Sequence, residues 1–369
     1  MKSVRVLQVV DSLSAAGKER VAVNLANLIQ GDGFRSYLCT TRMDGALEPQ
    51  IHENVGRLRL ARKRRYEFGG LYKLVAFIQE HQIRILHAHD TSVFIAGLAS
   101  FFPPYPAVVW HDHEGQFGLV ERPVWLYRMA ATRVKWVIAV SEPLAEWART
   151  KLHVPAKRVS YLPNFVCTSE SILESSESAN LPGVKGARIV CVAALRPQKD
   201  HVNLLRAMTL VVQKVPTAHL LLVGASRGDG DYVDLIRQTI VRGKLNKHVS
   251  LLGERQDVNA ILRSCSVGVL SSAGEAFPLT LLEYGIVGLP AVATRVGQCA
   301  EILDEGRAGL LVPPGSPDQL AEALVGLLTS PARRSTLGNE LKRRVEELYS
   351  SKRAREELCK IYDRVLDDV

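Results

Sequence analysis

Two glutamates eight residues apart, Glu275 and Glu283, follow a short apolar run and lead into an apolar helical pattern. This pattern places Glu275 on a loop and Glu283 within a helix. The start of that helix, from Phe277 to Thr280, presents free backbone N–H groups and the positive end of the helix dipole, which favour an anion. The segment predicts a phosphate site beside two carboxylates. The alternative is that both glutamates serve only helix capping and the helix dipole.

Two cations, Arg196 and Lys199, lie in the loop that follows the predicted strand at residues 188–193. Cations at the carboxyl end of a strand suit a diphosphate, because the charge that builds on such a leaving group must be neutralised. A solvated basic loop is the alternative. The loop is therefore predicted to contribute cations to the phosphate site beside Glu275 and Glu283.

Histidines at positions 87, 89, 111 and 113, with Asp112, offer a metal-binding alternative. We expect no metal there, because neighbouring side chains on a strand alternate between faces and no helical ligand spacing supports them. The sequence DGD at 229–231 looks like a metal motif, but its place before a predicted helix favours capping. The loop at 12–17 lacks GxGxxG, which argues against a classical NAD-binding turn. The sequence predicts no cofactor and no metal.

Short apolar runs alternate with amphipathic segments along the whole chain, which is typical of parallel sheets covered by helices. We expect two Rossmann-like domains facing each other across a cleft, with ligands at the carboxyl ends of both sheets. The predicted parts are a domain at 1–166, a Ser- and Glu-rich linker at 167–187, a domain at 188–348, and a closing helix at 349–369. The predicted strands are at 4–10, 36–40, 83–86, 106–110, 135–140, 159–162, 188–193, 219–224, 249–253, 267–270, 290–294 and 309–312.

Composition and charge narrow the class of protein further. Apolar residues make up 47% and charged residues 23% of the 369, as in ordinary globular domains. The six scattered cysteines indicate a reducing compartment rather than a disulfide framework or a zinc site. The charge-free stretch from 93 to 110 is long enough to be tested as a membrane span, but its three prolines favour helix, turn and strand. The short apolar N-terminus predicts a first strand rather than a secretory signal, so we expect a cytoplasmic protein.

The net charge of +9 belongs almost entirely to the first half of the chain. Residues 1–165 hold 22 lysines and arginines against 14 acidic residues. The densest part of this excess consists of Arg57, Arg59, Arg62, Lys63, Arg64 and Arg65. This basic cluster predicts contact with anionic lipid headgroups or a phosphorylated acceptor, the alternative being a solvated loop. Nucleic acid is disfavoured, because no recognition motif accompanies the charge.

Residues 271–294 resemble the donor-site motif of the group 1, retaining glycosyltransferases of GT-B fold, which has two glutamates separated by seven residues and then a small-residue stretch ending in Gly-Leu-Pro. The matching residues are Glu275, Phe277, Leu279, Leu282, Glu283, Gly288 and Pro290. The resemblance implies that Glu275 contacts hydroxyls of the transferred sugar and that Glu283 holds the ribose. Ala276 and Pro278 replace glycines of the motif. Since proline lacks a backbone N–H, we expect phosphate contacts to shift to the neighbouring amides.

The resemblance extends over almost the whole chain and assigns roles to further residues. Lys199 matches the family's lysine on the diphosphate, whereas the usual arginine position falls on Ala194, two residues before Arg196. His113 aligns with a histidine that reaches the transferred sugar and the reaction centre. Further positions expected at the donor are Gly17 in the first loop, Asn164, and Gly253, Glu254 and Arg255.

The resemblance implies a metal-independent hexosyltransferase that moves a sugar from a nucleoside-diphosphate sugar, UDP favoured over GDP, to an acceptor hydroxyl with retention. The acceptor is expected to be lipid-linked or a saccharide, in cell-envelope, exopolysaccharide or glycolipid synthesis. The basic first half favours peripheral attachment to the inner face of the cytoplasmic membrane. The closing helix is similar to the one that returns to the N-terminal domain in GT-B proteins. The alternatives are a non-catalytic membrane-associated homologue, a sugar-nucleotide epimerase, and a phosphorylase, for which no pyridoxal lysine is identified.

Overall fold

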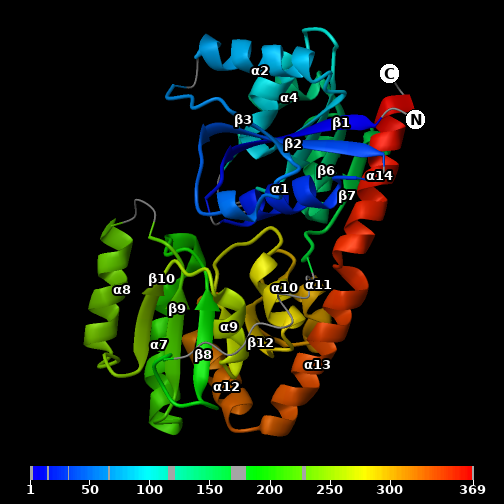
Figure 1. The fold of residues 1–369 in the computed structure, drawn as a ribbon. Helices are drawn as coiled ribbons and strands as arrows, with labels where there is room; N and C mark the ends of the chain where they lie inside the picture. Colours follow the sequence, from blue (N-terminus) through cyan, green and yellow to red (C-terminus); the bar gives the residue numbers. More distant parts are fainter. Residues whose placement is uncertain are drawn as a thin grey trace. The chain divides into compact units, whose positions relative to one another are not determined.

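The computed structural model describes residues 3–14, 16–31, 33–64, 67–114, 121–167, 180–226 and 230–367. The chain divides into two compact units, one comprising Met1–Phe165 with Ser351–Val369 and the other Val166–Ser350 (Figure 1). The closing helix thus groups with the first unit, as expected for a GT-B chain. Most of the predicted linker, residues 168–179, lies outside the described residues, so its conformation stays a prediction.

The first unit is built on a seven-stranded parallel sheet in the order β3-β2-β1-β4-β5-β6-β7. Its strands are β1 (Val4–Ser12), β2 (Phe34–Met43), β3 (Gly56–Arg59), β4 (Ile85–His89), β5 (Ala107–Asp112), β6 (Val134–Ala139) and β7 (Val159–Tyr161). Its helices are α1 (Gly17–Leu28), α2 (Phe68–Glu80), α3 (Val93–Ala99), α4 (Val124–Ala131), α5 (Glu142–Thr150) and α14 (Ser351–Asp367). Short 3-10 turns occur at η1 (Glu48–Gln50), η2 (Asp90–Ser92) and η3 (Ala156–Arg158).

The second unit is built on a six-stranded parallel sheet in the order β10-β9-β8-β11-β12-β13. Its strands are β8 (Arg188–Val192), β9 (His219–Val223), β10 (Val249–Gly253), β11 (Val267–Leu270), β12 (Ala291–Thr294) and β13 (Leu310–Val312). Its helices are α7 (His201–Lys214), α8 (Gly230–Arg242), α9 (Val258–Arg263), α10 (Leu279–Ile286), α11 (Cys299–Ile302), α12 (Pro317–Leu328) and α13 (Pro331–Leu348). The 3-10 turns η4 (Pro197–Lys199) and η5 (Asp304–Gly306) complete it.

Each of the twelve predicted strands overlaps a strand of the structure, because strands covered by helices on both faces are continuous apolar runs. The stretch from 93 to 110 forms α3 and most of β5, as predicted. No helix in the described part of the chain is long and apolar enough to cross a bilayer. The sequence pattern missed β3, an edge strand in which Arg57 and Arg59 alternate with smaller or apolar residues. Charged side chains suit such an edge, because they discourage pairing with another strand.

Amphipathic helices close the core of each unit. In the second unit, α7 buries Leu204, Met208 and Val211 against the sheet residues Ile189 and Leu222. In the first unit, α14 buries Ala354, Leu358, Ile361, Tyr362 and Val365, which recur at the helical period, and it contacts α1 and β6. The final helix is therefore held to the first unit by an apolar stripe along its length.

The direction of strand order reverses once in each sheet. The reversal lies between β1 and β4 in the first unit and between β8 and β11 in the second. The loops that leave these neighbouring strands diverge to opposite faces of the sheet, which opens a crevice for ligands at their carboxyl ends. In the second unit most predicted site residues lie on or next to these loops, whereas in the first unit Gly17 follows β1 but His113 follows β5 and Asn164 follows β7.

Candidate functional site

Lys199 and Glu275 meet at the strand-order reversal of the second unit. Lys199 lies on the loop after β8, and Glu275 on the loop after β11. The Lys199 Nζ lies 2.5 Å from Glu275 Oε1, and the Ser272 hydroxyl donates to the same oxygen at 2.6 Å. The Glu275 side chain is nearly buried, whereas Lys199 is about a quarter exposed. The structure thus brings together two residues that the sequence analysis assigned to separate motifs.

Backbone contacts hold these two loops against each other. The Ala273 N–H donates to the Gln198 carbonyl, and the Gln198 amide donates to the Gly274 carbonyl, both at 2.8 Å. The Ser271 hydroxyl donates to the Lys199 carbonyl at 3.0 Å. Because both loops are fixed along their length, the ammonium and the carboxylate are positioned before any ligand arrives.

Helix α10 begins directly after this loop, and Pro278 is its N-cap. The missing N–H of Pro278 therefore falls outside the helix, and the first amides of α10, from Leu279 and Thr280, keep no partner within the helix. The Thr280 hydroxyl donates to the Val192 carbonyl at the end of β8, at 3.0 Å. This bond places the helix N-terminus at the carboxyl end of β8. Glu283 lies one turn into α10, as predicted.

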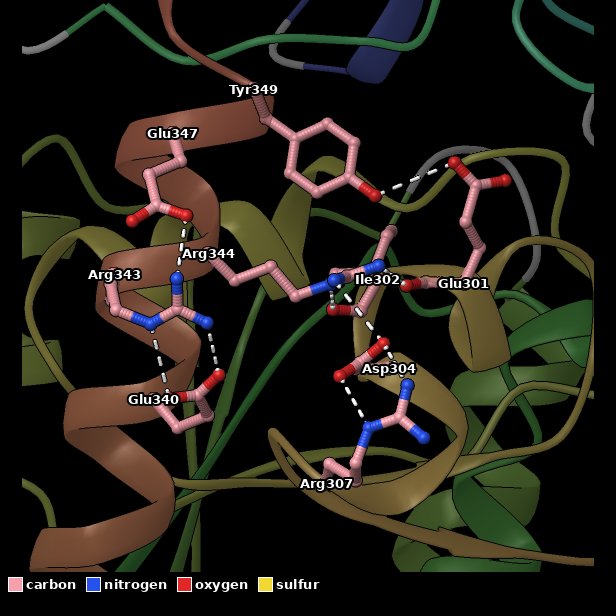
Figure 2. Close-up of polar contacts among 9 residues, drawn as sticks. All are labelled: Glu301, Ile302, Asp304, Arg307, Glu340, Arg343, Arg344, Glu347 and Tyr349. Atoms are coloured by element: carbon pink, nitrogen blue, oxygen red, sulfur yellow. Dashed lines mark hydrogen bonds and ion pairs between the residues drawn. The ribbon is translucent and has the colours of Figure 1, made fainter.

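The Glu275 loop is supported from behind by α11 and α13. The Gln298 N–H donates to the Ala276 carbonyl at 3.0 Å, and the Tyr349 ring packs edge-on against Phe277, with 5.5 Å between the ring centres. Figure 2 shows the Tyr349 hydroxyl directed at the Glu301 carboxylate, 3.4 Å away. In the same view Arg344 of α13 donates to the Glu301 carbonyl at 2.8 Å. These contacts hold the Glu275 loop against α11 and the end of α13.

Gly297 approaches the Glu275 loop more closely than any other residue type could. It has φ +49°, and a Cβ atom built on it would lie 2.0 Å from the Glu275 carbonyl oxygen. Only glycine fits at that distance. Gly297 was not predicted from the sequence, although its place between β12 and α11 gives it a direct role in holding Glu275.

The remaining predicted donor residues of the second unit differ in how they are held. Arg196 is exposed, and no ion pair engages its guanidinium within the described residues. Gly253 ends β10 with φ +68°, a left-handed conformation that favours glycine, and Glu254 beside it is exposed. Arg255 forms a two-bond pair with Asp257 at 2.7 and 2.6 Å, which raises the pKa of the guanidinium.

Gly17 follows β1, which borders the strand-order reversal of the first unit, and His113 follows β5, one strand beyond β4 in the sheet. Gly17 begins α1, and Lys18 beside it pairs with Asp90 at 3.4 Å. The other Asp90 oxygen accepts a hydrogen bond from the backbone N–H of His113 at 2.7 Å, which ties the His113 backbone to the same loop cluster. Burial disfavours charge on Lys18, but Asp90, Glu19 and Asp11 together raise its pKa above the usual value. Asn164, the third predicted donor residue of this unit, is buried next to its C-terminal boundary.

Four histidines gather in one buried group: His87 and His89 of β4, His111 of β5, and His113 directly after β5. The expectation that strand alternation separates them is wrong, because His87 and His89, like His111 and His113, are two residues apart and share a face. Burial lowers the pKa of His87 to about 3 and that of His113 to about 4. Burial also lowers the pKa of the other two well below the usual value, so all four rings are neutral near pH 7.

The basic cluster is partly neutralised. Arg57 pairs with Glu48 at 3.0 Å, and Arg59 pairs with Asp44 at 2.8 Å. These two arginines lie on the edge strand β3 rather than in a loop, and the contact of the cluster with an anionic surface or acceptor stays a prediction. Lys63 and Arg64 are exposed, Arg62 is partly buried, and Arg65 lies outside the described residues.

Several residues that shape both sites were not predicted from the sequence. Lys18 and Asp90 carried a usable signal, since a lysine follows the glycine of the first loop and an aspartate follows a buried strand. The DGD sequence, for which capping was favoured over a metal site, lies where α8 starts: the helix begins at Gly230 with Asp231 in its first turn, and Asp229 lies outside the described residues. A helix start was the expected reading.

Both units match models of known protein families. Residues 15–170 match the family model described as Glycosyltransferase Family 4, and residues 186–330 match the one described as Glycosyl transferases group 1. Together the two models account for most of the chain.

Curated relatives match a large part of the chain, and a solved structure shares its fold. The chain is 30% identical over 268 residues to an exopolysaccharide phosphotransferase of Streptomyces coelicolor, covering 70% of this chain but only 27% of that protein. It is 26% identical to a UDP-Gal:alpha-D-GlcNAc-diphosphoundecaprenol alpha-1,3-galactosyltransferase of Escherichia coli, covering 69% of this chain and 68% of that one. The crystal structure of Anabaena HepE in complex with UDP and glucose superposes with a TM-score of 0.83 over 98% of this chain and all of the other, at 19% identity.

Proposed function

The chain belongs to the group 1, family 4 glycosyltransferases of GT-B fold, and we propose that it transfers a sugar from a nucleoside-diphosphate sugar to an acceptor hydroxyl with retention of anomeric configuration. The observation that carries the proposal is the contact between Lys199 and Glu275 at the strand-order reversal of the second unit, beside the start of α10. A cation, a carboxylate and free helix amides at one point suit a sugar diphosphate, whose phosphates are anionic and whose sugar hydroxyls donate hydrogen bonds.

Each of these groups has a role in the proposed reaction. Glu275 accepts hydrogen bonds from hydroxyls of the transferred sugar, and Glu283 holds the ribose. Lys199, with Arg196 and the first amides of α10, stabilises the charge that builds on the leaving diphosphate. A diphosphate oxygen then accepts the proton of the attacking hydroxyl on the same face, which accounts for retention. Because Lys199 supplies the cation, the reaction needs no metal ion.

UDP is the nucleotide that we propose for the donor. HepE is described with UDP and glucose, and the E. coli relative uses UDP-galactose, which supports UDP over GDP. The loop from Gly253 to Arg255 is the proposed contact for the base and ribose. Its left-handed glycine leaves the backbone open there, since a Cβ at Gly253 would meet nothing within 4 Å.

Thermal unfolding with UDP, GDP, CDP, ADP and NAD, each with and without EDTA, tests the donor class, because a ligand that binds the folded state raises the apparent stability. We expect a selective rise with UDP that EDTA does not change. The variant Lys199→Met should lose most of this rise, whereas Lys214→Met, an exposed lysine at the end of α7, should keep it. A rise with NAD alone, or no rise with any diphosphate, would contradict the proposal. Donor interconversion without acceptor would favour the epimerase alternative.

We also propose that the first unit meets an anionic membrane surface from the cytoplasmic side, where a lipid-linked or saccharide acceptor is glycosylated. Aromatic side chains on α2 and α4 support this: Phe68 is 83%, Tyr72 77% and Trp125 66% exposed. Helix α3 contacts both of these helices, so the aromatic side chains belong to one region. Exposed aromatic rings in a unit that also exposes Lys63 and Arg64 match the chemistry of a lipid interface. The six free cysteines are consistent with a reducing compartment.

Vesicle flotation tests the membrane proposal. The protein should float with vesicles containing phosphatidylglycerol and not with phosphatidylcholine alone, and high salt should weaken the binding. Reversing charge at Lys63 and Arg64 should abolish flotation, whereas the same reversal at Arg206 and Lys214 of α7 in the second unit should not. Equal flotation of both double variants would contradict the assignment of this surface.

A further inference from the structure

A buried chain of hydrogen bonds joins six side chains of the first unit across β1, β4, β5 and α14. Gln8 stands at its centre. The Gln8 amide nitrogen lies 3.2 Å from the Tyr362 hydroxyl, which lies 2.7 Å from His87 Nδ1. His87 Nε2 lies 3.0 Å from His111 Nδ1. On the other side, Gln8 Oε1 lies 2.9 Å from His89 Nε2, and His89 Nδ1 lies 2.9 Å from His113 Nε2.

Both ends of this network are ring nitrogens. His111 Nε2 and His113 Nδ1 are buried and have no hydrogen-bond partner within the described residues. The five hydrogen bonds use five protons. Each of the four neutral rings supplies one proton, and the Tyr362 hydroxyl and one Gln8 N–H supply one each. The six side chains thus offer one proton more than the five hydrogen bonds use. The extra proton therefore lies on one end nitrogen, and the other end is a bare acceptor.

The orientation of the Gln8 amide decides which end carries the proton. With the nitrogen toward Tyr362, the Tyr362 O–H donates to His87, and His87 Nε2–H donates to His111. On the other arm, His113 Nε2–H donates to His89, and His89 Nε2–H donates to the Gln8 oxygen. All four rings are then protonated on Nε2. Turning the amide over would move every ring proton to Nδ1, so the four tautomers change together.

We propose that Gln8 and Tyr362 are positioning residues that hold His113 in its Nε2–H form, with Nδ1 as a bare hydrogen-bond acceptor. This inference rests on the proposed function, in which His113 serves the sugar-transfer reaction. A bare Nδ1 accepts a hydrogen bond from a hydroxyl of the sugar or of the acceptor, and a protonated Nδ1 would repel that same hydrogen. Tyr362 of the last helix thus sets the tautomer of His113, which lies 249 positions earlier in the sequence.

A metal site is the competing use of the same rings. Ring nitrogens of His87, His89 and His111 lie within 4.8 Å of one another. Both nitrogens of His87 and both of His89 are already engaged in the network, however, so a metal would have to break hydrogen bonds in the core. The observed distances and the buried Gln8 and Tyr362 favour the network.

Ring nitrogen NMR of the full chain, labelled with 15N histidine, tests the proposal directly and needs no substrate. Single histidine replacements assign the signals. We expect His87, His89, His111 and His113 to be neutral at pH 7.5, each protonated on Nε2 and bare on Nδ1. A proton on Nδ1 of His113, different tautomers among the four rings, or a stoichiometric metal bound to them would overturn the proposal.

The variant Tyr362→Phe supplies the second test. Without the hydroxyl, the Gln8 N–H would be buried with no acceptor, which costs more than an unpaired carbonyl. We expect the amide to turn and to donate to His89, which moves the proton of His113 to Nδ1. The turnover number for sugar transfer should then fall at least tenfold with little change in donor affinity. The control Tyr37→Phe, a buried tyrosine of β2, should change neither the tautomers nor the rate.

The two readouts separate failure of this inference from failure of the proposed function. If the tautomers follow the prediction but no nucleotide sugar reacts, the network stands and the reaction is wrong. If sugar is transferred but His113 keeps its Nε2 proton in the Tyr362→Phe protein, Gln8 and Tyr362 do not set the tautomer.

Discussion

Lowering the pH from 7 to 5 should destabilise the first unit, because its four buried histidines resist protonation. In the unfolded chain these rings take up protons near a pKa of about 6.5. In the folded unit burial lowers the pKa of His87 to about 3 and that of His113 to about 4, and it lowers those of His89 and His111 as well. The unfolded state therefore binds more protons over this interval. The stability that the rings contribute is complete above pH 6.5 and is lost as the pH falls.

The size of the effect follows from the pKa values of His87 and His113. At pH 5 an unfolded histidine is almost fully protonated, whereas His87 and His113 are not, so each loses about 2 kcal/mol of stability relative to pH 7. Asp112 acts in the opposite direction, because burial, opposed by Arg122, raises its pKa to about 6. Protonation of the Asp112 carboxyl offsets the loss of stability by about 1 kcal/mol. Glu19, whose pKa burial also raises, offsets it further. With His89 and His111 included, a net loss of about 3 kcal/mol or more is expected.

Tryptophan fluorescence during urea unfolding measures this loss in the first unit alone. All four tryptophans lie in that unit: Trp110, Trp125, Trp136 and Trp147. With a urea dependence of about 2–3 kcal/mol per molar for a unit of this size, the midpoint should fall by about 1 M or more between pH 7 and pH 5. A midpoint that stays constant or rises would refute the reasoning, since it would mean that the rings are charged or solvated in the folded state.

Three substitutions test other parts of the account. Lys199→Met should lower the transfer rate about a hundredfold, since one charge contact to a developing anion is worth about 3 kcal/mol; an unchanged rate would remove Lys199 from the reaction. Gly297→Ala should reduce activity strongly while the first unit unfolds as before, because its Cβ would lie 2.0 Å from the Glu275 carbonyl oxygen; normal kinetics would show that the loop yields. Arg122→Met should destabilise the first unit by about 3–5 kcal/mol in the urea assay, because it leaves buried Asp112 unpaired; a change under 1 kcal/mol would contradict a buried ion pair there.

The strands and the main site motifs were predictable from the sequence, because both depend on local patterns. The buried strands of parallel sheets are short apolar runs. The loops that follow these strands carry the polar and charged site residues at the carboxyl edge of the sheet. The edge strand β3 was missed since its alternation of Arg57 and Arg59 looks like a charged loop. This segment forms a strand because it pairs with β2 in the sheet, and its composition does not indicate that pairing.

Contacts between distant segments were not predictable. Lys199 and Glu275 were each assigned a role, but their 2.5 Å contact depends on the order of β8 and β11 in the sheet. The contact between Gln8 and Tyr362 joins residues 354 positions apart and requires the last helix to pack on the first unit. The histidine group was misjudged because alternation was applied to adjacent positions, whereas residues two apart on paired strands share a face.

A transfer assay with purified protein tests the central claim most directly. UDP-sugars carrying labelled sugar are incubated with a bacterial lipid extract in the presence of EDTA, using the wild type, Lys199→Met and Glu275→Gln. The account predicts a labelled product whose anomeric configuration is that of the donor, formed by the wild type and reduced about a hundredfold in both variants. Equal transfer by the variants would place the chemistry elsewhere, and donor binding without any transfer by the wild type would contradict the claim that this protein is a transferase.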